Sequence, residues 1–223
     1  MADPDEPGRR RPTLTREKIL AGAVAFADEH GVEALSMRKL AGALGFEVMS
    51  LYNHVANKAD ILGGVVDLVI VDVVLPPAEV DWRTSIHQMV GQAHRALLQH
   101  PWVTLLWYTT PPGAARLRYL EALLEILRGR AGFSSEVTRH GFHAVNRHLL
   151  GFAAEEVDVH VGDDDLSGNV AGFLEQISEG QYPRLVEHAN HRIAHLADDD
   201  DFFVGLDLIL DGLEQASARR REP

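Results

Sequence analysis

Apolar residues recur at helical spacing along most of the chain, in segments that begin at capping residues and end at glycine or proline. The first segment follows Thr15, a residue type that favours the N-cap of a helix, and Gly31 stands where that helix would end. The apolar stripe between them consists of Ile19, Leu20, Ala23, Val24, Phe26 and Ala27. The pattern predicts a helix over residues 16–30.

A more compact pattern runs from Ser36 to Lys58. Ser36 can cap a second helix that Gly45 ends nine residues later, and a third helix is expected from Glu47 to about Val55. Two helices this short are not stable alone, so the helices before and after must clamp them. Such a pair of short helices is the arrangement that inserts one helix into the major groove of DNA.

The same helical pattern continues to the C-terminus. Asn57 caps a fourth helix that is expected to end at the proline pair 76–77, although its β-branched run leaves a strand as the alternative. One later helix should bury a stripe of leucines at 117, 120, 124 and 127. Helices are further expected over 82–97, 102–108, 117–127, 135–158, 166–177, 185–193 and 202–218. The predicted fold class is all-α, because no alternating strand pattern competes.

Composition and charge change this picture in one respect. The chain has 223 residues, no cysteine and a formal net charge of −12. The charge is unevenly spread, since residues 9–58 hold eight Lys and Arg against five Asp and Glu, whereas residues 61–223 hold 13 Arg against 24 acids. A basic segment on an acidic body suits a protein that touches DNA with one end, although acidic surface also serves solubility. Residues 1–12 are polar, hold three prolines and are expected to be a disordered arm.

The N-terminal motifs resemble those of the tetracycline-repressor (TetR) family. The resemblance rests on TREKIL, Gly31, the segment SMRKLAGALG, a third helix ending LYNHV, and NKADIL, and it covers roughly residues 13–66. The body resembles the tetracycline-repressor subgroup more loosely. The resemblance implies a helix-turn-helix DNA-binding domain over 13–60 and a helical effector-binding and dimerisation domain over 61–223. It further implies a homodimeric repressor that binds a palindromic operator and is released by a small-molecule effector.

Candidate DNA contacts follow from helix geometry together with this resemblance. Leu51 and Val55 are the apolar pair at i, i+4 of the third helix, so its other side chains can face the groove. Val48 and Met49 can touch thymine methyl groups but cannot form bidentate bonds with a purine. Core packing is the alternative for Tyr52 and His54. The predicted contact residues are Ser36, Arg38, Val48, Met49, Ser50, Tyr52, His54 and Lys58.

The family's effector pocket lies inside the body. A drug-sized ligand needs an apolar box with a few polar groups, and plain core packing is the alternative for every candidate. The candidates are Met89, Trp102, Trp107, Phe142, Asn146, Phe152 and Phe173. The tetracycline–magnesium site of the subgroup is not expected, because the segment YTTPPG at 108–113 lacks its histidine. No cofactor and no metal site are predicted, and the histidine pairs 140/143 and 191/195 are interpreted as solvated.

The dimer is expected to form through the helices near 135–158 and 202–218 as a four-helix bundle. The last helix carries more apolar residues than one face needs, namely Phe202, Phe203, Leu206, Ile209, Leu210 and Leu213. With no signal peptide and no membrane span in the sequence, a cytoplasmic location is expected. Two alternatives stay open, a helical ligand-binding enzyme and an adaptor without DNA binding, although no nucleophile elbow or phosphate-binding loop supports the first.

Overall fold

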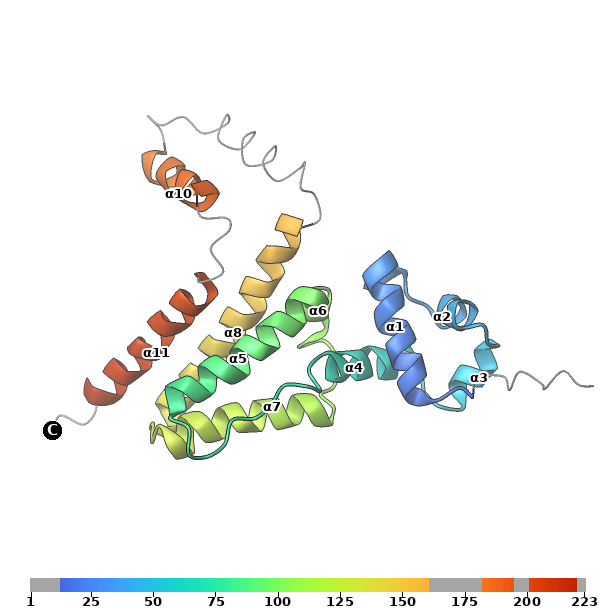
Figure 1. The fold of residues 1–223 in the computed structure, drawn as a ribbon, viewed down its shortest axis with the longest axis horizontal. Coiled ribbons are helices and arrows are strands. Elements are labelled where there is room, and N and C mark those ends of the chain that lie inside the picture. The colour runs from blue at the N-terminus through green and yellow to red at the C-terminus, as the bar shows by residue number, and fades with distance from the viewer. Residues whose placement is uncertain (1–12, 161–181, 195–200, 220–223) are drawn as a thin grey trace, which may run out of the picture.

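The computed structural model describes residues 13–160, 182–194 and 201–219, and its regular elements are helices (Figure 1). The N-terminal head consists of α1 (Arg16–His30), α2 (Met37–Leu44) and α3 (Val48–Tyr52), and α4 (Lys58–Val69) leads from the head into the body. The body contains α5 (Trp82–Gln99), α6 (Val103–Leu106), α7 (Ala114–Glu125), α8 (Ser135–His160), α10 (Pro183–Ala194) and α11 (Asp201–Arg219). The prediction of an all-α fold is confirmed.

The head is assembled from the capping residues that the sequence predicts. The Thr15 hydroxyl accepts a hydrogen bond from the backbone N–H of Lys18 at 3.3 Å, and the Ser36 hydroxyl accepts one from that of Lys39 at 3.2 Å. Gly45 ends α2 in the left-handed conformation with a φ of 74°, a region that favours glycine. These caps fix the lengths of the short helices, and burial of Leu40 between them holds the helices together.

Two helices of the head region are shorter than predicted. The α3 helix ends at Tyr52 instead of continuing to Val55, and α4 ends at Val69, well before the proline pair. After Val69 the chain turns and buries Ile70 and Val73, while the backbone N–H of Val74 donates to the side-chain oxygen of Gln92 at 3.0 Å. Only the part of the β-branched run after Val69 therefore lies outside a helix, which the low helix propensity of β-branched residues favours.

The buried face of α7 also differs from the predicted one. Of the predicted leucines, only Leu127, just beyond α7, is fully buried. Leu117 is 53% exposed and Leu120 and Leu124 are half-buried, whereas Tyr119 and Leu123 are fully buried. The ring of Tyr119 meets that of Trp107 edge to face, with centroids 5.8 Å apart. An aromatic side chain buries more apolar area than a leucine, so this helix turns its tyrosine face inward.

The core of the body lies between α5, α8 and α11. On α5, Trp82 is half-buried, and the helix packs against α8 and α11 through the fully buried side chains of Ile86, Met89, Val90, Ala93 and Leu97. The α4 helix contacts α1 on one side and both α6 and α7 on the other, so it links the head mechanically to the body. In Figure 1 the head lies at one end of the molecule, and α8 and α11 lie toward the opposite end.

Candidate nucleic-acid interface

The tip of the head is formed by α2 and α3, which lie on the side away from the body (Figure 1). Leu51 is fully buried and Val55 is 3% exposed, so these two residues anchor α3 to the head as predicted. Helical geometry then turns the opposite side of α3 to solvent. An exposed helix face at the tip of the head is the arrangement in which a recognition helix meets the major groove.

The structure brings the eight predicted contact residues together on α2, α3 and the start of α4. Met49 is 72% exposed and Tyr52 is 45% exposed, so neither is a core residue. Arg38 and His54 are exposed as well, while Ser36, Ser50 and Lys58 are half-buried. The Ser36 hydroxyl already caps α2, which leaves the backbone N–H groups of that helix end for a phosphate.

Val48 is placed differently from the other candidates. It stands three residues before Leu51, which puts both side chains on one side of the helix, and it packs half-buried against the head core. Its position therefore suits anchoring α3 more than reading a base. The burial of Val48 could not be predicted from its residue type, since an apolar residue at this position fits either role.

An ion pair that the sequence analysis missed holds the turn between α3 and α4. The Arg16 guanidinium donates to both carboxylate oxygens of Asp60, at 2.6 and 2.9 Å. The second oxygen also accepts from the backbone N–H of Ala56 at 2.9 Å. The Arg16 hydrogen bonds hold the pKa of the Asp60 carboxyl below its ordinary value. This bidentate contact fixes the segment that carries His54 and Lys58, and it joins residues 44 positions apart.

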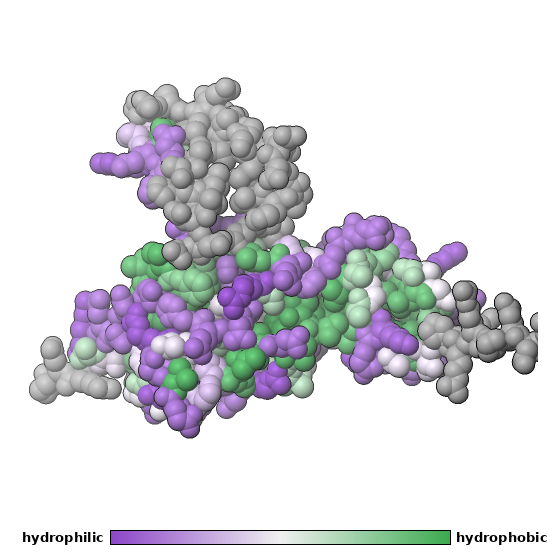
Figure 2. Space-filling view, in the orientation of Figure 1, coloured by the Kyte–Doolittle hydropathy of each residue, from purple (hydrophilic) through white to green (hydrophobic). Residues whose placement is uncertain are grey.

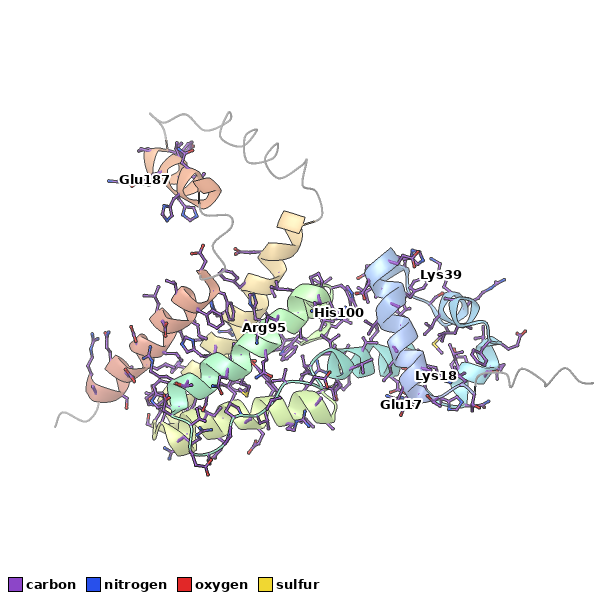
Figure 3. All side chains as sticks on the ribbon, viewed as in Figure 1. Glu17, Lys18, Lys39, Arg95, His100 and Glu187 are labelled. Carbon is purple, nitrogen blue, oxygen red and sulfur yellow. The ribbon has the colours of Figure 1, made fainter. Side chains whose placement is uncertain are left out.

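The head meets the body through a second set of polar contacts. Asp28 of α1 accepts from the Trp102 indole N–H at 2.8 Å and from Nδ1 of His100 at 2.9 Å. Figure 3 places His100 on the side of the body that faces α1. Trp102, which was predicted in the effector pocket, thus lies at the joint between head and body and is not grouped with the other pocket candidates.

On α4, the Asp67 carboxylate caps the N-terminus of α7. It accepts hydrogen bonds from the backbone N–H groups of Gly113 at 3.2 Å, Ala115 at 3.0 Å and Arg116 at 3.3 Å. Beside this cap a cleft of about 570 Å³ separates α4 from the connection before α7. The joint between head and body is therefore held by the hydrogen bonds of Asp28 and Asp67, and a cleft lies beside the second of these contacts.

The remaining pocket candidates lie in or near the body core. Met89, Trp107 and Asn146 are buried, Phe142 and Phe152 are half-buried, and Phe173 lies outside the described residues. The Asn146 amide donates to the carbonyl of Phe142 at 2.9 Å, while its oxygen is buried with no hydrogen-bond partner among the described residues. A buried amide oxygen of this kind can accept a hydrogen bond from an ordered water or from a ligand, so the ligand role of Asn146 stays a prediction.

Burial perturbs two titratable groups in the same region. Desolvation lowers the pKa of His94 to about 4, with further lowering by the nearby His148 and Arg95, so the imidazole is neutral at pH 7. Burial also raises the pKa of the Tyr119 phenol above its ordinary value. The described interior thus combines aromatic side chains and a neutral His94 with one buried guanidinium, that of Arg116, which donates to the Trp107 carbonyl at 2.6 Å.

Two kinds of site are not found among the described residues. No group of three or more His, Asp or Glu side chains in those ranges could hold a metal ion. Within the same ranges, no helix combines the length and the apolar character needed to cross a membrane.

Comparison with known proteins agrees with this geometry. The C-terminal domain model of tetracyclin-repressor-like proteins matches residues 75–217, and the model of bacterial regulatory proteins of the tetR family matches residues 19–65. An HTH-type transcriptional regulator of Saccharopolyspora erythraea is 36% identical over 190 residues, which are 82% of this chain and 78% of that protein.

Two solved structures are informative. ActR of Streptomyces coelicolor in complex with actinorhodin has a TM-score of 0.77 and 28% identity, with 92% of this chain and 99% of ActR covered. BioQ with its natural double-stranded DNA operator has a TM-score of 0.63 and 25% identity, with 90% of this chain and 98% of BioQ covered.

The fold and the exposed recognition helix define a helix-turn-helix DNA-binding protein. Matches over most of the chain make the assignment more specific: the chain belongs to the TetR family of transcriptional regulators, with a C-terminal domain of the tetracycline-repressor type. It is a DNA-binding regulator and not an enzyme, so the enzyme and adaptor alternatives are set aside.

Proposed function

We propose that this regulator is a homodimeric repressor that binds a palindromic operator and is released by a small-molecule effector bound in its body. The observation that carries the proposal is the solvent-facing side of α3, presented opposite the buried Leu51 and flanked by Arg38 and Lys58. Two cations beside an exposed helix face suit a contact in which phosphates position the helix and base edges are read by its centre. Access to DNA implies that it acts in the cytoplasm.

Four of the six apolar residues on which the expected dimer surface of α11 rested cannot contribute to it. Phe202, Leu206, Leu210 and Leu213 of α11 are buried within their own chain, so these four do not form a surplus for a partner. Instead, Val204 is 56% exposed and Leu208 is 70% exposed, at i, i+4 on the outer side of α11.

Figure 2 shows a hydrophobic patch at the upper left of the body, in the area that α8 and α11 occupy in Figure 1. An apolar helix face beside a second long helix is what a four-helix dimer bundle buries. We therefore place the dimer contact on the outer faces of α8 (Ser135–His160) and α11. Two heads held at a fixed separation would meet half-sites about one DNA turn apart, or a multiple of it.

Release by an effector is supported by the route from the body interior to the head. Trp107, beside Tyr119 in the interior, lies at the end of α6. The Asp67 carboxylate links α4 to the start of α7. A ligand that displaced these residues would move α4, and α4 carries Lys58. A relative, ActR, holds actinorhodin in its solved structure. An aromatic effector suits the aromatic side chains described here, Trp107 and Tyr119 among them.

In the test, the full chain is used to select the duplexes that it binds from a random DNA library. Its affinity for a selected duplex is then measured from the fluorescence anisotropy of the labelled DNA. The Tyr52→Ala and Lys58→Ala variants are expected to lose most operator affinity while circular dichroism and the native mass stay unchanged. Tyr182→Ala is the matched control, because Tyr182 is also exposed, at 49%, but lies on the body. Binding of the selected duplex by both variants as tightly as by the wild type would refute the proposal.

A further inference from the structure

The centre of the exposed face of α3 is occupied by two residues, Met49 and Asn53. Resting on the proposed function, we propose that these two residues are the base-reading pair and that Asn53 selects an adenine in each half-site, beside a thymine contacted by Met49. The candidate DNA contacts derived from the sequence did not include Asn53.

Helix geometry assigns this central position. Successive residues of a helix are rotated by about 100°, so Met49 and Asn53, two positions before and after Leu51, each lie about 160° away from it. Asn53 keeps this direction because its backbone is helical, with φ −72° and ψ −15°. The backbone N–H of Val55 still bonds the Leu51 carbonyl at 3.0 Å, so the helical turn extends past Asn53. With Leu51 at the base of the helix, these two side chains point most directly outward.

The neighbours of the pair occupy the sides of the helix. Ser50 and Tyr52 lie about 100° from Leu51, one on each flank. When α3 enters a groove, residues on the flanks meet the sugar–phosphate walls and residues at the centre meet the base edges. This geometry assigns Tyr52 to a phosphate contact and leaves base recognition to the central pair.

Neither central side chain has a structural task in the head. Met49 is 72% exposed, the largest fraction among the large hydrophobic side chains that the structure describes. Asn53 is exposed, and its amide forms no hydrogen bond within the described ranges. Another amide nearby, that of Asn57, is by contrast used to cap α4, accepting from the backbone N–H of Asp60 at 3.0 Å. Asn53 therefore has both its donor and its acceptor available for a ligand.

The chemistry of the pair points to adenine and thymine. The Asn53 amide can donate to N7 of adenine and accept from its N6 amino group, which is the bidentate match for that base in the major groove. Met49 offers an apolar surface for the methyl group of thymine. Side chains at i, i+4 lie about 5–6 Å apart, and successive base pairs are about 3.4 Å apart, so the two residues can contact neighbouring base pairs.

The pair is uncharged, which separates its contribution from that of the cations. Removing Lys58 should reduce the slope of log affinity against log salt by about 1, because a phosphate contact is lost. Removing the Asn53 amide should leave the slope unchanged and affect one sequence position in each half-site. A salt titration therefore distinguishes a base contact from a phosphate contact.

The experiment compares duplexes enriched by the wild type and by Asn53→Ala. The wild type is expected to favour adenine at one symmetric position about 5- to 150-fold, and the variant is expected to lose that preference alone. Replacing this adenine with 7-deazaadenine, which lacks N7, should weaken the wild type but not the variant. Gln99→Ala removes an exposed amide on α5 instead and should change nothing.

The outcomes separate this proposal from the one on which it rests. If the wild type enriches a duplex and Asn53→Ala enriches the same sequence with the same adenine preference, the base-reading role of Asn53 is overturned and the repressor proposal stands. Equal losses of affinity on 7-deazaadenine in both proteins would overturn it too, as would a reduced salt slope in Asn53→Ala. If the wild type enriches no duplex at all, the proposed function itself fails.

Discussion

Replacing Asp67 with alanine tests the tie between head and body. The substitution removes a carboxylate that accepts three backbone hydrogen bonds at the N-terminus of α7. Loss of an N-cap costs about 1–2 kcal/mol, and leaving partly buried N–H groups unpaired adds about 1 kcal/mol. The expected loss is about 2–3 kcal/mol, which lowers the melting temperature of a chain of this size by about 4–12 °C.

The assay is thermal unfolding followed by circular dichroism at a fixed protomer concentration, since dimer stability depends on concentration. Asp67→Asn keeps a carbonyl oxygen as acceptor and should lose less than Asp67→Ala. Asp72→Ala is the matched control, because Asp72 is an exposed carboxylate just beyond α4. If the free energies of unfolding of Asp67→Ala and Asp72→Ala differ by less than about 0.5 kcal/mol, as for an ordinary surface substitution, the Asp67 cap does not stabilise the joint between head and body.

Three further predictions concern the body. The pKa of His94 is lowered to about 4 in the folded state, so between pH 6.5 and 4 the imidazole is protonated in the unfolded chain but not in the folded one. The free energy of unfolding should therefore fall by at most about 3 kcal/mol as the pH drops from 6.5 to 4. Urea unfolding against pH should show this slope, and His94→Gln should flatten it while the exposed His143→Gln should not. Leu208→Glu places a charge on the outer face of α11 and should convert the dimer to a monomer, which analytical ultracentrifugation measures. A variant that remains dimeric would mean that the dimer contact lies elsewhere. Gly205→Ala brings a Cβ within 2.6 Å of the His148 ring and should destabilise the fold by about 1–3 kcal/mol in urea unfolding, whereas Gly212→Ala has nothing within 4 Å and should not.

Local sequence signals proved sufficient for the beginnings of helices. Thr15, Ser36 and Asn57 all cap the helices predicted for them, because capping depends on a few adjacent residues. The predicted end of α4 at the proline pair was wrong. The segment after Val69 is held by a contact with α5, the hydrogen bond between Val74 and Gln92, which joins residues 18 positions apart. Such a contact leaves no periodic trace in the sequence.

The candidate site was predictable to the same extent. The exposed face of α3 follows from Leu51 and Val55 alone, which is why the recognition helix could be found. The Arg16–Asp60 ion pair and the place of Trp102 against Asp28 depend on how separate helices pack, and no spacing rule reports that. The face of α7 was misjudged because that helix has two apolar sides, and only the contact with Trp107 selects one of them.

The most direct test of DNA binding through the head is the affinity for a selected duplex measured against salt concentration. Several phosphate contacts from residues such as Arg38 and Lys58 predict that log affinity falls linearly with log salt, by about 0.9 for each contact. A slope of about −2 or steeper for the wild type, reduced by about 1 in Lys58→Ala, would support the account. An affinity that does not change with salt would contradict it.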